Sequence, residues 1–109
     1  MTNVFTLDAM GITDNAIKLA RKFKSERIIT ITVKKDTVKY SGSSANVKFI
    51  FDDNDIIEII QGFGIGYNGT GPTGLYTILT QDFNIDPEKA EAVFVPWAGD
   101  EEIVFNLSK

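Results

Sequence analysis

The chain contains no cysteine and no histidine among its 109 residues. Without cysteine it can form no disulfide, carry no thiolate nucleophile and bind no metal through sulfur. Without histidine it lacks the side chain that most often acts as a general base near neutral pH or as a metal ligand. A serine or cysteine triad of the usual kind and a histidine-bearing zinc site are therefore excluded. We accordingly expect a protein that is not an enzyme and that uses no cofactor and no metal.

Long apolar runs are missing too. No stretch is long and apolar enough to cross a membrane, and the first residues, MTNVFTLDAMG, lack the basic and then apolar pattern of a secretory signal. The missing cysteine also fits a reducing compartment. We therefore expect a cytoplasmic protein that does not use a membrane. Its length predicts one domain, residues 1–109, with a modest core.

The net charge of −4 is distributed unevenly along the chain. Residues 1–50 hold nine Lys/Arg and four Asp/Glu, whereas residues 51–109 hold two Lys/Arg and eleven Asp/Glu. Such asymmetry suggests a charged partner, although folding can interleave the two halves on one surface. The overall acidity and the scarcity of aromatic residues beside the basic ones argue against nucleic acid as that partner. We expect the partner to be another protein.

Two helices follow from the spacing of apolar residues. One face of the first helix would carry Ala16, Leu19, Ala20 and Phe23. These positions recur at intervals of three and four, which is the period of a helix, so we expect a helix over 14–25 with Thr13 as its N-cap. A second helix would have Pro72 in its first turn and end near Phe83, with Leu75, Ile78 and Leu79 facing inward.

Alternation of apolar and polar residues predicts the strands. They are expected at 29–33, 38–40, 46–51, 56–61, 93–97 and 103–107, with turns or loops at 35–36, 41–46, 52–55 and 98–101. The last two strands would form a hairpin. Ile56–Gln61 could also form a short helix, but its β-branched residues favour a strand. The sum is an α+β domain with a mostly antiparallel sheet of five to six strands and two helices packed on one face.

The segment Gly62–Gly74, GFGIGYNGTGPTG, holds six of the nine glycines. It resembles two phosphate-binding patterns without matching either. The helix begins too late after the G-x-G-x-x-G of Gly64–Gly69, and Leu75 stands where a P-loop needs lysine. Free N–H groups at the helix start can still hold an anion. The alternative is a long turn whose glycines permit close packing, although thirteen residues is a length typical of functional loops.

These features predict a small non-enzymatic binding protein that acts on another macromolecule, as an inhibitor, immunity protein or regulator. The candidate residues for ligand or partner binding are Phe63, Gly64, Gly66, Tyr67, Asn68, Gly69, Thr70, Gly71, Thr73, Tyr76 and Trp97. The candidate acidic contact surface consists of Asp52, Asp53, Asp55 and Glu58. An exposed apolar patch in the glycine-rich segment would favour a protein partner. The alternative is a small-ligand module in which Gly62–Gly74 and the next helix hold an anionic group such as a nucleotide phosphate.

Overall fold

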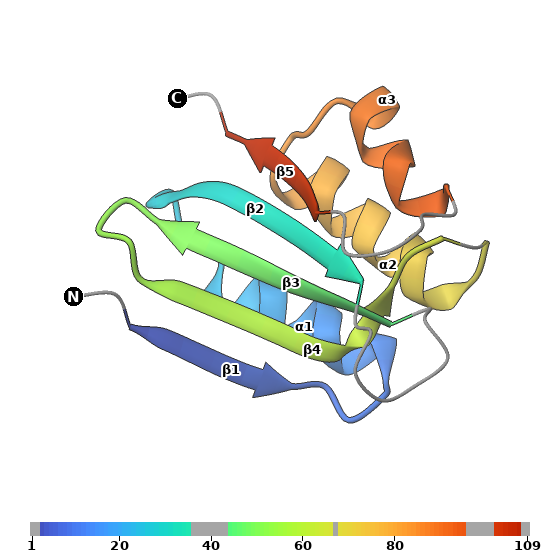
Figure 1. Ribbon diagram of the computed structural model, residues 1–109, viewed down its shortest axis with the longest axis horizontal. Helices are drawn as coiled ribbons and strands as arrows, with labels where there is room; N and C mark the ends of the chain where they lie inside the picture. The colour runs from blue at the N-terminus through green and yellow to red at the C-terminus, as the bar shows by residue number, and fades with distance from the viewer. Residues whose placement is uncertain (1–2, 36–43, 67, 96–101, 108–109) are drawn as a thin grey trace.

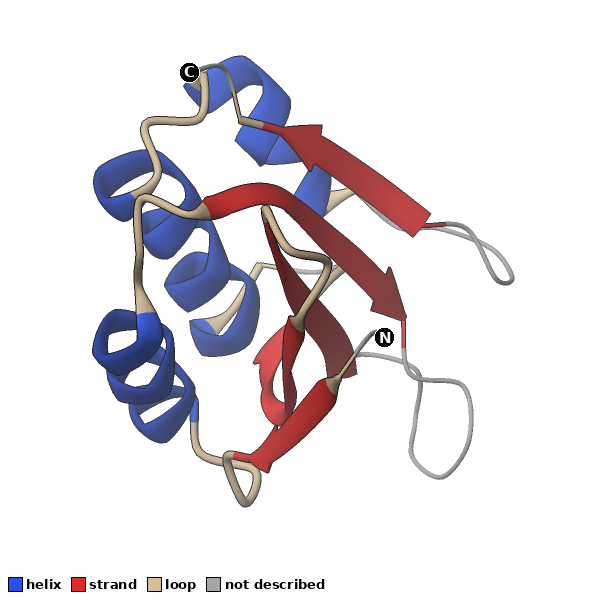
Figure 2. Ribbon diagram, turned by 90° about the vertical axis from the view of Figure 1, so that its left-hand side faces the viewer, coloured by secondary structure: helices blue, strands red, loops and turns tan. Residues whose placement is uncertain are grey.

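A five-stranded sheet and one layer of helices make up the structure, a computed structural model that describes residues 3–35, 44–66, 68–95 and 102–107 (Figures 1 and 2). In chain order the elements are β1 (Val4–Asp8), α1 (Thr13–Phe23), β2 (Ile28–Lys35), β3 (Ser44–Phe51), β4 (Ile56–Gly64), α2 (Thr70–Thr77), the π-helical turn η1 (Ile78–Asp82), α3 (Pro87–Ala90), the 3₁₀ turn η2 (Glu91–Phe94) and β5 (Glu102–Asn106). None of the helices in these ranges has the length and apolar character needed to span a membrane. The α+β class is confirmed.

The sheet is mixed, with the strand order β1-β4-β3-β2-β5. The pairs β4–β3, β3–β2 and β2–β5 are antiparallel, as expected, whereas β1 and β4 run parallel. All helices cover the same face of the sheet (Figure 2). The opposite face, which we call the open face, meets no helix in the described part of the chain.

The core lies between the sheet and the helices. The buried side chains that meet there include Ile31, Val33, Val47, Phe49, Ile59 and Phe105 from the sheet and Ala16, Ala20, Leu75, Ile78 and Leu79 from the helices. In the strands these residues alternate with residues of the open face, because successive side chains point to opposite faces. The inward positions predicted for both helices are thereby confirmed, except that Phe23 at the end of α1 is 36% exposed.

A bulge of three residues in β4 brings the end of this strand close to α1. Ala45 pairs with Phe63 and Val47 pairs with Ile59, so one residue of β3 lies opposite three residues of β4. Gln61, the middle one of the three, adopts a left-handed backbone with φ of 57°. Bulges of this kind bend a strand and increase its twist. The bend directs the backbone of the following residue towards α1.

Gly62 is the residue at which β4 and α1 touch. A Cβ atom there would lie 2.5 Å from the Cβ of Ala16 and 2.6 Å from the Cβ of Ala9. Thr13 Oγ1 donates a hydrogen bond of 2.8 Å to the carbonyl oxygen of Gly62. The prediction that Thr13 is the N-cap of α1 is therefore wrong. Thr13 is the first residue of the helix, and Ile12 occupies the cap position without a side-chain hydrogen bond. The contact with β4 draws the threonine hydroxyl away from the helix terminus.

The chain after α2 differs most from the expected fold. Asp86 caps α3 by accepting a 3.0 Å hydrogen bond from the N–H of Glu88, with Pro87 at the first helical position. The helical path continues through η2 to Phe94, so the predicted strand over 93–97 is wrong for 93–95. β5 accordingly pairs with β2 and not with that segment. The rest of the predicted hairpin, including its tip at 98–101, lies outside the described residues.

The β2–β3 hairpin is also longer than expected. Ser44 and Ala45, predicted as part of a loop over 41–46, belong to β3, and Ala45 is paired with Lys35 of β2. The small side chain of Ala45 is fully buried, which favours a place in the sheet over a place in a solvated loop. The expected return strand at 38–40 lies outside the described residues. The predicted strands at 29–33, 46–51, 56–61 and 103–107 are confirmed, and the turn at 52–55 separates β3 from β4.

Candidate functional site

The first half of the glycine-rich segment belongs to the core. Phe63 and Ile65 are each 2% exposed, and Gly64 between them is buried. The N–H of Gly66 donates a 2.7 Å hydrogen bond to the carbonyl of Val93. These residues are thus fixed between β4 and η2. An exposed apolar patch at Phe63 and Ile65, which would have favoured a protein partner at this place, does not form.

The second half of the segment forms the start of α2. Asn68, Thr70 and Thr73 are exposed there, while Gly71 is buried and Gly69 is half-buried. Within the described part of the glycine-rich segment, the polar side chains of these three predicted site residues are exposed at the surface. No side chain caps this helix at Gly69.

Two further residues of α2 serve its packing. Tyr76 is half-buried against Phe94, with 5.5 Å between the ring centres. A Cβ atom on Gly74 would lie 2.5 Å from Cγ2 of Thr13, so glycine allows α2 to approach α1. The predicted site residues Tyr67 and Trp97 lie outside the described part of the chain.

Three of the four residues of the predicted acidic surface lie together in the β3–β4 turn. Arg27 binds two of them, with Nη2 2.6 Å from Oδ2 of Asp53 and 3.0 Å from Oδ1 of Asp52. Asp55 accepts a 3.3 Å hydrogen bond from the side-chain amide of Asn3. Glu58 lies apart from the turn, on the open face. Arg27 therefore offsets part of the negative charge that the sequence places here.

The same contacts shift two pKa values. The backbone N–H of Asp55, followed by the Arg27 guanidinium, holds the pKa of Asp53 below its ordinary value. The hydrogen bonds to Asp52 and Asp53 raise the pKa of Arg27. All three side chains are about half-exposed, so solvent screens the ion pairs and their contribution to stability is small.

Acid is expected to remove the contribution of this turn to stability. The pKa of Asp53 is lower in the folded protein than in the unfolded chain, so its ionised form stabilises the fold above the unfolded pKa of about 3.9. That contribution is lost as the pH falls through the folded pKa. Asp53→Asn should lower Tm slightly at neutral pH and not at all near about pH 2. Thermal unfolding by circular dichroism across this range tests it, and an equal difference at both ends would contradict it.

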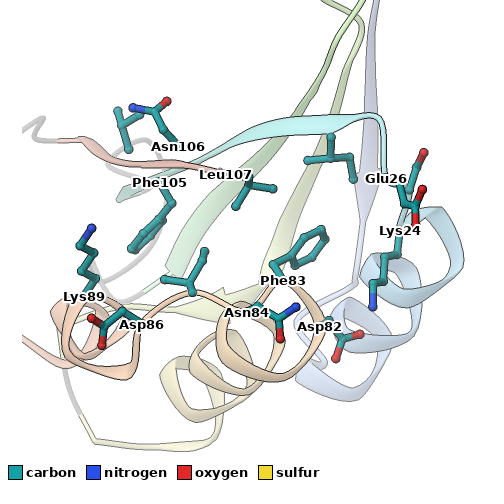
Figure 3. Close-up of a pocket in the computed structure, with 14 residues that line it drawn as sticks. Lys24, Glu26, Asp82, Phe83, Asn84, Asp86, Lys89, Phe105, Asn106 and Leu107 are labelled. Carbon is teal, nitrogen blue, oxygen red and sulfur yellow. The ribbon is translucent and has the colours of Figure 1, made fainter. Parts of the chain in front are cut away.

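A pocket of about 640 Å³ lies on another part of the molecule, beside β5 (Figure 3). Four segments line it: residues 24–26 and 28 of the α1–β2 connection and the start of β2, residues 82–86 at the end of η1 and after it, Lys89 of α3, and residues 104–107 of β5 and its end. These segments meet where the helix layer adjoins the β5 edge of the sheet (Figure 3). None of the pocket residues was predicted as a site residue.

The pocket has an apolar floor and charged ends. Phe83, Phe105 and Leu107 point into it from the helix layer and from the end of the chain at β5 (Figure 3), and Ile85 also lines it. Phe83 stacks on Phe49 at 5.5 Å between ring centres, which ties the floor to the core.

At one end of the pocket lie Lys24, Glu26 and Asp82, and at the other lie Asp86 and Lys89 (Figure 3). An apolar floor with a few polar groups is typical of binding sites.

The wall formed by residues 82–86 has an unusual backbone. η1 is a π-helical turn, a rare feature that is often found at functional sites. Asn84 follows it with a left-handed φ of 56° and ends the helix, a position where asparagine or glycine is common. The N–H of Ile85 then donates a 2.9 Å hydrogen bond to the carbonyl of Leu79. The tight ending turns Phe83 and Ile85 towards the pocket.

β5 borders the pocket with an unpaired backbone edge. The N–H of Leu107 donates a 2.9 Å hydrogen bond to Ile29, which shows that odd-numbered residues of β5 bond to β2. In an antiparallel pair the hydrogen-bonding direction alternates, so the N–H and C=O groups of Val104 and Asn106 point to the outer edge. No strand within the described ranges pairs with that edge. Both residues also line the pocket, which therefore reaches this edge.

No protein-family model matches the chain, and no curated protein or solved structure matches it significantly. Two features stand out in the described residues: the exposed polar start of α2 and the pocket along the unpaired edge of β5. The second combines main-chain groups, apolar side chains and charged ends in one place. It is the stronger candidate site.

Proposed function

We propose that this protein is a non-enzymatic binding protein whose partner is another protein. An extended segment of that partner pairs with the outer edge of β5 and inserts every second side chain into the adjacent pocket. The observation that carries the proposal is the position of the Val104 and Asn106 backbone groups at the rim of an apolar pocket. This mode is known as strand addition, in which main-chain hydrogen bonds give affinity and pockets give specificity.

The dimensions define the partner segment. β5 has five residues, so an added strand of the same length spans about 17 Å. Side chains of a strand alternate between the two faces of the sheet. Two or three side chains of the partner would thus point to the helix side, where Phe83, Ile85 and Phe105 form the floor. We expect apolar residues at those alternate positions.

The charged ends of the pocket determine which residues of the partner segment can lie on either side of its apolar residues. Asp82 already binds Arg21 at 3.2 Å, and Asp86 caps α3. Lys24 and Lys89, at opposite ends, have no ion pair among the described residues. A partner segment with a carboxylate near each end would meet both lysines. The flanking acidic residues would be screened by salt, so they contribute more to partner choice than to affinity.

We include the exposed residues of the glycine-rich segment in this proposal, as a second region that contacts the partner. Asn68, Thr70 and Thr73 are exposed and can contact a partner, whereas Phe63 is buried and cannot do so by its side chain. The alternative of an anionic ligand at the start of α2 stays a prediction. It expects Gly69→Val to abolish ligand binding while the fold survives.

Panning a randomised library of seven-residue peptides tests strand addition. Wild-type protein should select peptides with apolar residues at alternate positions. Val104→Pro removes an outward N–H and leaves the β2 ladder intact, since proline is tolerated on an edge strand whose N–H faces solvent. Each lost main-chain hydrogen bond costs about 1 kcal/mol, so we expect the proline variant to bind the selected peptides about fivefold more weakly.

Val104→Thr is the matched control, because it changes the same side chain on the open face and keeps the backbone N–H. We expect it to bind within about twofold of wild type. Thermal unfolding of both variants shows whether the fold is kept. Equal affinity of Val104→Pro and wild type, or failure to select any peptide on the wild-type protein, would contradict the proposal.

A further inference from the structure

The open face of the sheet presents an ordered pattern of side chains. Strand register places its residues in rows that cross the strands. Two rows, read from β1 through β4 and β3 to β2, are Val4, Ile56, Ile50 and Thr30, and then Thr6, Glu58, Lys48 and Thr32. Two residues further along, Asp8 of β1 pairs with Ile60 and Lys34 of β2 pairs with Asn46, on either side of the bulge between β3 and β4. Unlike the inner face, this surface mixes apolar residues with charges, and no described helix covers it (Figure 2).

The second row carries a pair of opposite charges on adjacent strands. Lys48 of β3 and Glu58 of β4 are direct cross-strand neighbours, and both are half-buried. Thr6 Oγ1 donates a 3.3 Å hydrogen bond to Oε1 of Glu58. The boundary between β3 and β4 thus divides a positive position from a negative one. Rotation by 180° about an axis along this boundary exchanges the two.

That rotation makes the face complementary to itself. With the axis lying between two stacked sheets, β3 of one copy lies over β4 of the other, and β2 lies over β1. Lys48 then faces Glu58 of the second copy, and Lys34 faces Asp8, the exposed residue at the end of β1. In the first row, Ile50 faces Ile56. Two positive residues meet two negative ones, and the most apolar row meets itself.

We propose that the open face is a dimer interface between two copies of this chain, related by a two-fold axis along the β3–β4 boundary. Stacked sheets pack about 10 Å apart with their strands rotated by about 30°, which displaces the residues nearest the axis least. Lys48 and Glu58 are those residues, so they fix the register. A two-fold interface uses the same patch on both copies.

The dimer does not depend on the peptide-binding function. β5 has no counterpart on the far side of β1, so it extends beyond the overlap of the two sheets. Its Glu102 side chain neighbours Lys34 within the same chain. The outer edge of β5 and the pocket remain accessible in the dimer. Each proposal can therefore fail without the other.

Charge exchange between copies provides the test. Lys48→Glu creates a face with two adjacent carboxylates, and Glu58→Lys creates one with two ammonium groups. We expect each variant alone to dimerise at least about tenfold more weakly than wild type, because like charges then face each other across the interface. An equimolar mixture of the two variants places carboxylates over ammonium groups at both positions. It should recover the dimer that neither variant forms alone.

Light scattering on a size-exclusion column measures this result at about 100 µM protein, with Lys18→Glu on the exposed face of α1 as a control that should remain dimeric. A monomeric wild type, single variants that dimerise like wild type, or a folded mixture that stays monomeric would each overturn the proposal. Should either variant unfold by circular dichroism, the same mixing experiment is made with Asp8→Lys and Lys34→Asp and judged by the same outcomes.

Discussion

Phe63→Ala is expected to lower the free energy of unfolding by about 3–5 kcal/mol, the usual cost of removing a buried phenylalanine ring. The ring is 2% exposed and lies in the core between the sheet and the helices. Its loss removes apolar surface from the core and leaves a cavity that the surroundings cannot fill completely. A domain of this size is stable by only about 5–15 kcal/mol, so the variant would be close to unfolding at elevated temperature.

Phe5→Ala is the matched control for this measurement. Phe5 lies on the inner side of the edge strand β1 but is 56% exposed, so the same chemical change removes little buried surface. We expect it to cost about 1 kcal/mol or less. Urea unfolding followed by circular dichroism gives both values. Similar costs for the two variants, or near wild-type stability of Phe63→Ala, would show that Phe63 is not a core residue and would return it to the contact surface.

Gly62→Asn is expected to lower the free energy of unfolding by about 1–3 kcal/mol or more. A Cβ atom at Gly62 would lie within 2.6 Å of two others, those of Ala9 and Ala16. Alanine has no rotamer that could move its Cβ away. The strain must therefore be relieved by shifting α1 away from β4, which disturbs the packing of the helix on the sheet.

The same substitution at Gly11 separates close packing from backbone conformation. Gly11 has a left-handed φ of 78°, but no heavy atom lies within 4 Å of the place that its Cβ would take. Asparagine tolerates the left-handed region better than other residues, so Gly11→Asn should cost about 1 kcal/mol or less. A larger loss of stability from Gly11→Asn than from Gly62→Asn would contradict the close contact between β4 and α1.

The layer structure of this protein could be predicted because its inner face is strongly periodic. Val47 and Phe49 alternate with polar residues, and Ala16 and Ala20 recur at helical spacing. Such patterns are imposed by burial on one side, so they survive in the sequence. The pairing of strands is less evident from the sequence. β1 has exposed Val4 and Phe5, because it is an edge strand, and nothing local indicates that it pairs with β4 in parallel.

The strand expected over 93–97 shows how a local pattern can mislead. Val93 is fully buried and Phe94 is half-buried, a pattern that also fits a strand with one face on the core. The Asp86–Pro87 pair upstream starts a helix, however, and its path continues into η2. A short apolar run is compatible with a strand or with a helix. Here the helix that starts a few residues earlier determines that the run is helical. Recognising Asp86 as an N-cap would have been the available signal.

The candidate site was beyond the reach of the sequence for a physical reason. Its pocket is formed by segments that meet only after folding, with Lys24, Phe83 and Phe105 contributed by different parts of the chain. The glycine-rich segment, in contrast, was conspicuous locally. The close approaches of Gly62 and Gly74 depend on α1, which lies some fifty residues earlier. A concentration of glycine thus indicated tight packing as well as the start of a helix.

Amide hydrogen exchange at β5 is the measurement that tests strand addition most directly. The protein is compared alone and with a saturating concentration of a seven-residue peptide selected by panning. The N–H groups of Val104 and Asn106 point outward, so we predict that bound peptide slows their exchange at least about tenfold. The N–H of Phe105 already bonds to β2 and should change less. Unchanged exchange at Val104 and Asn106, with protection at residues 68–73 instead, would contradict binding at the β5 edge and favour the start of α2.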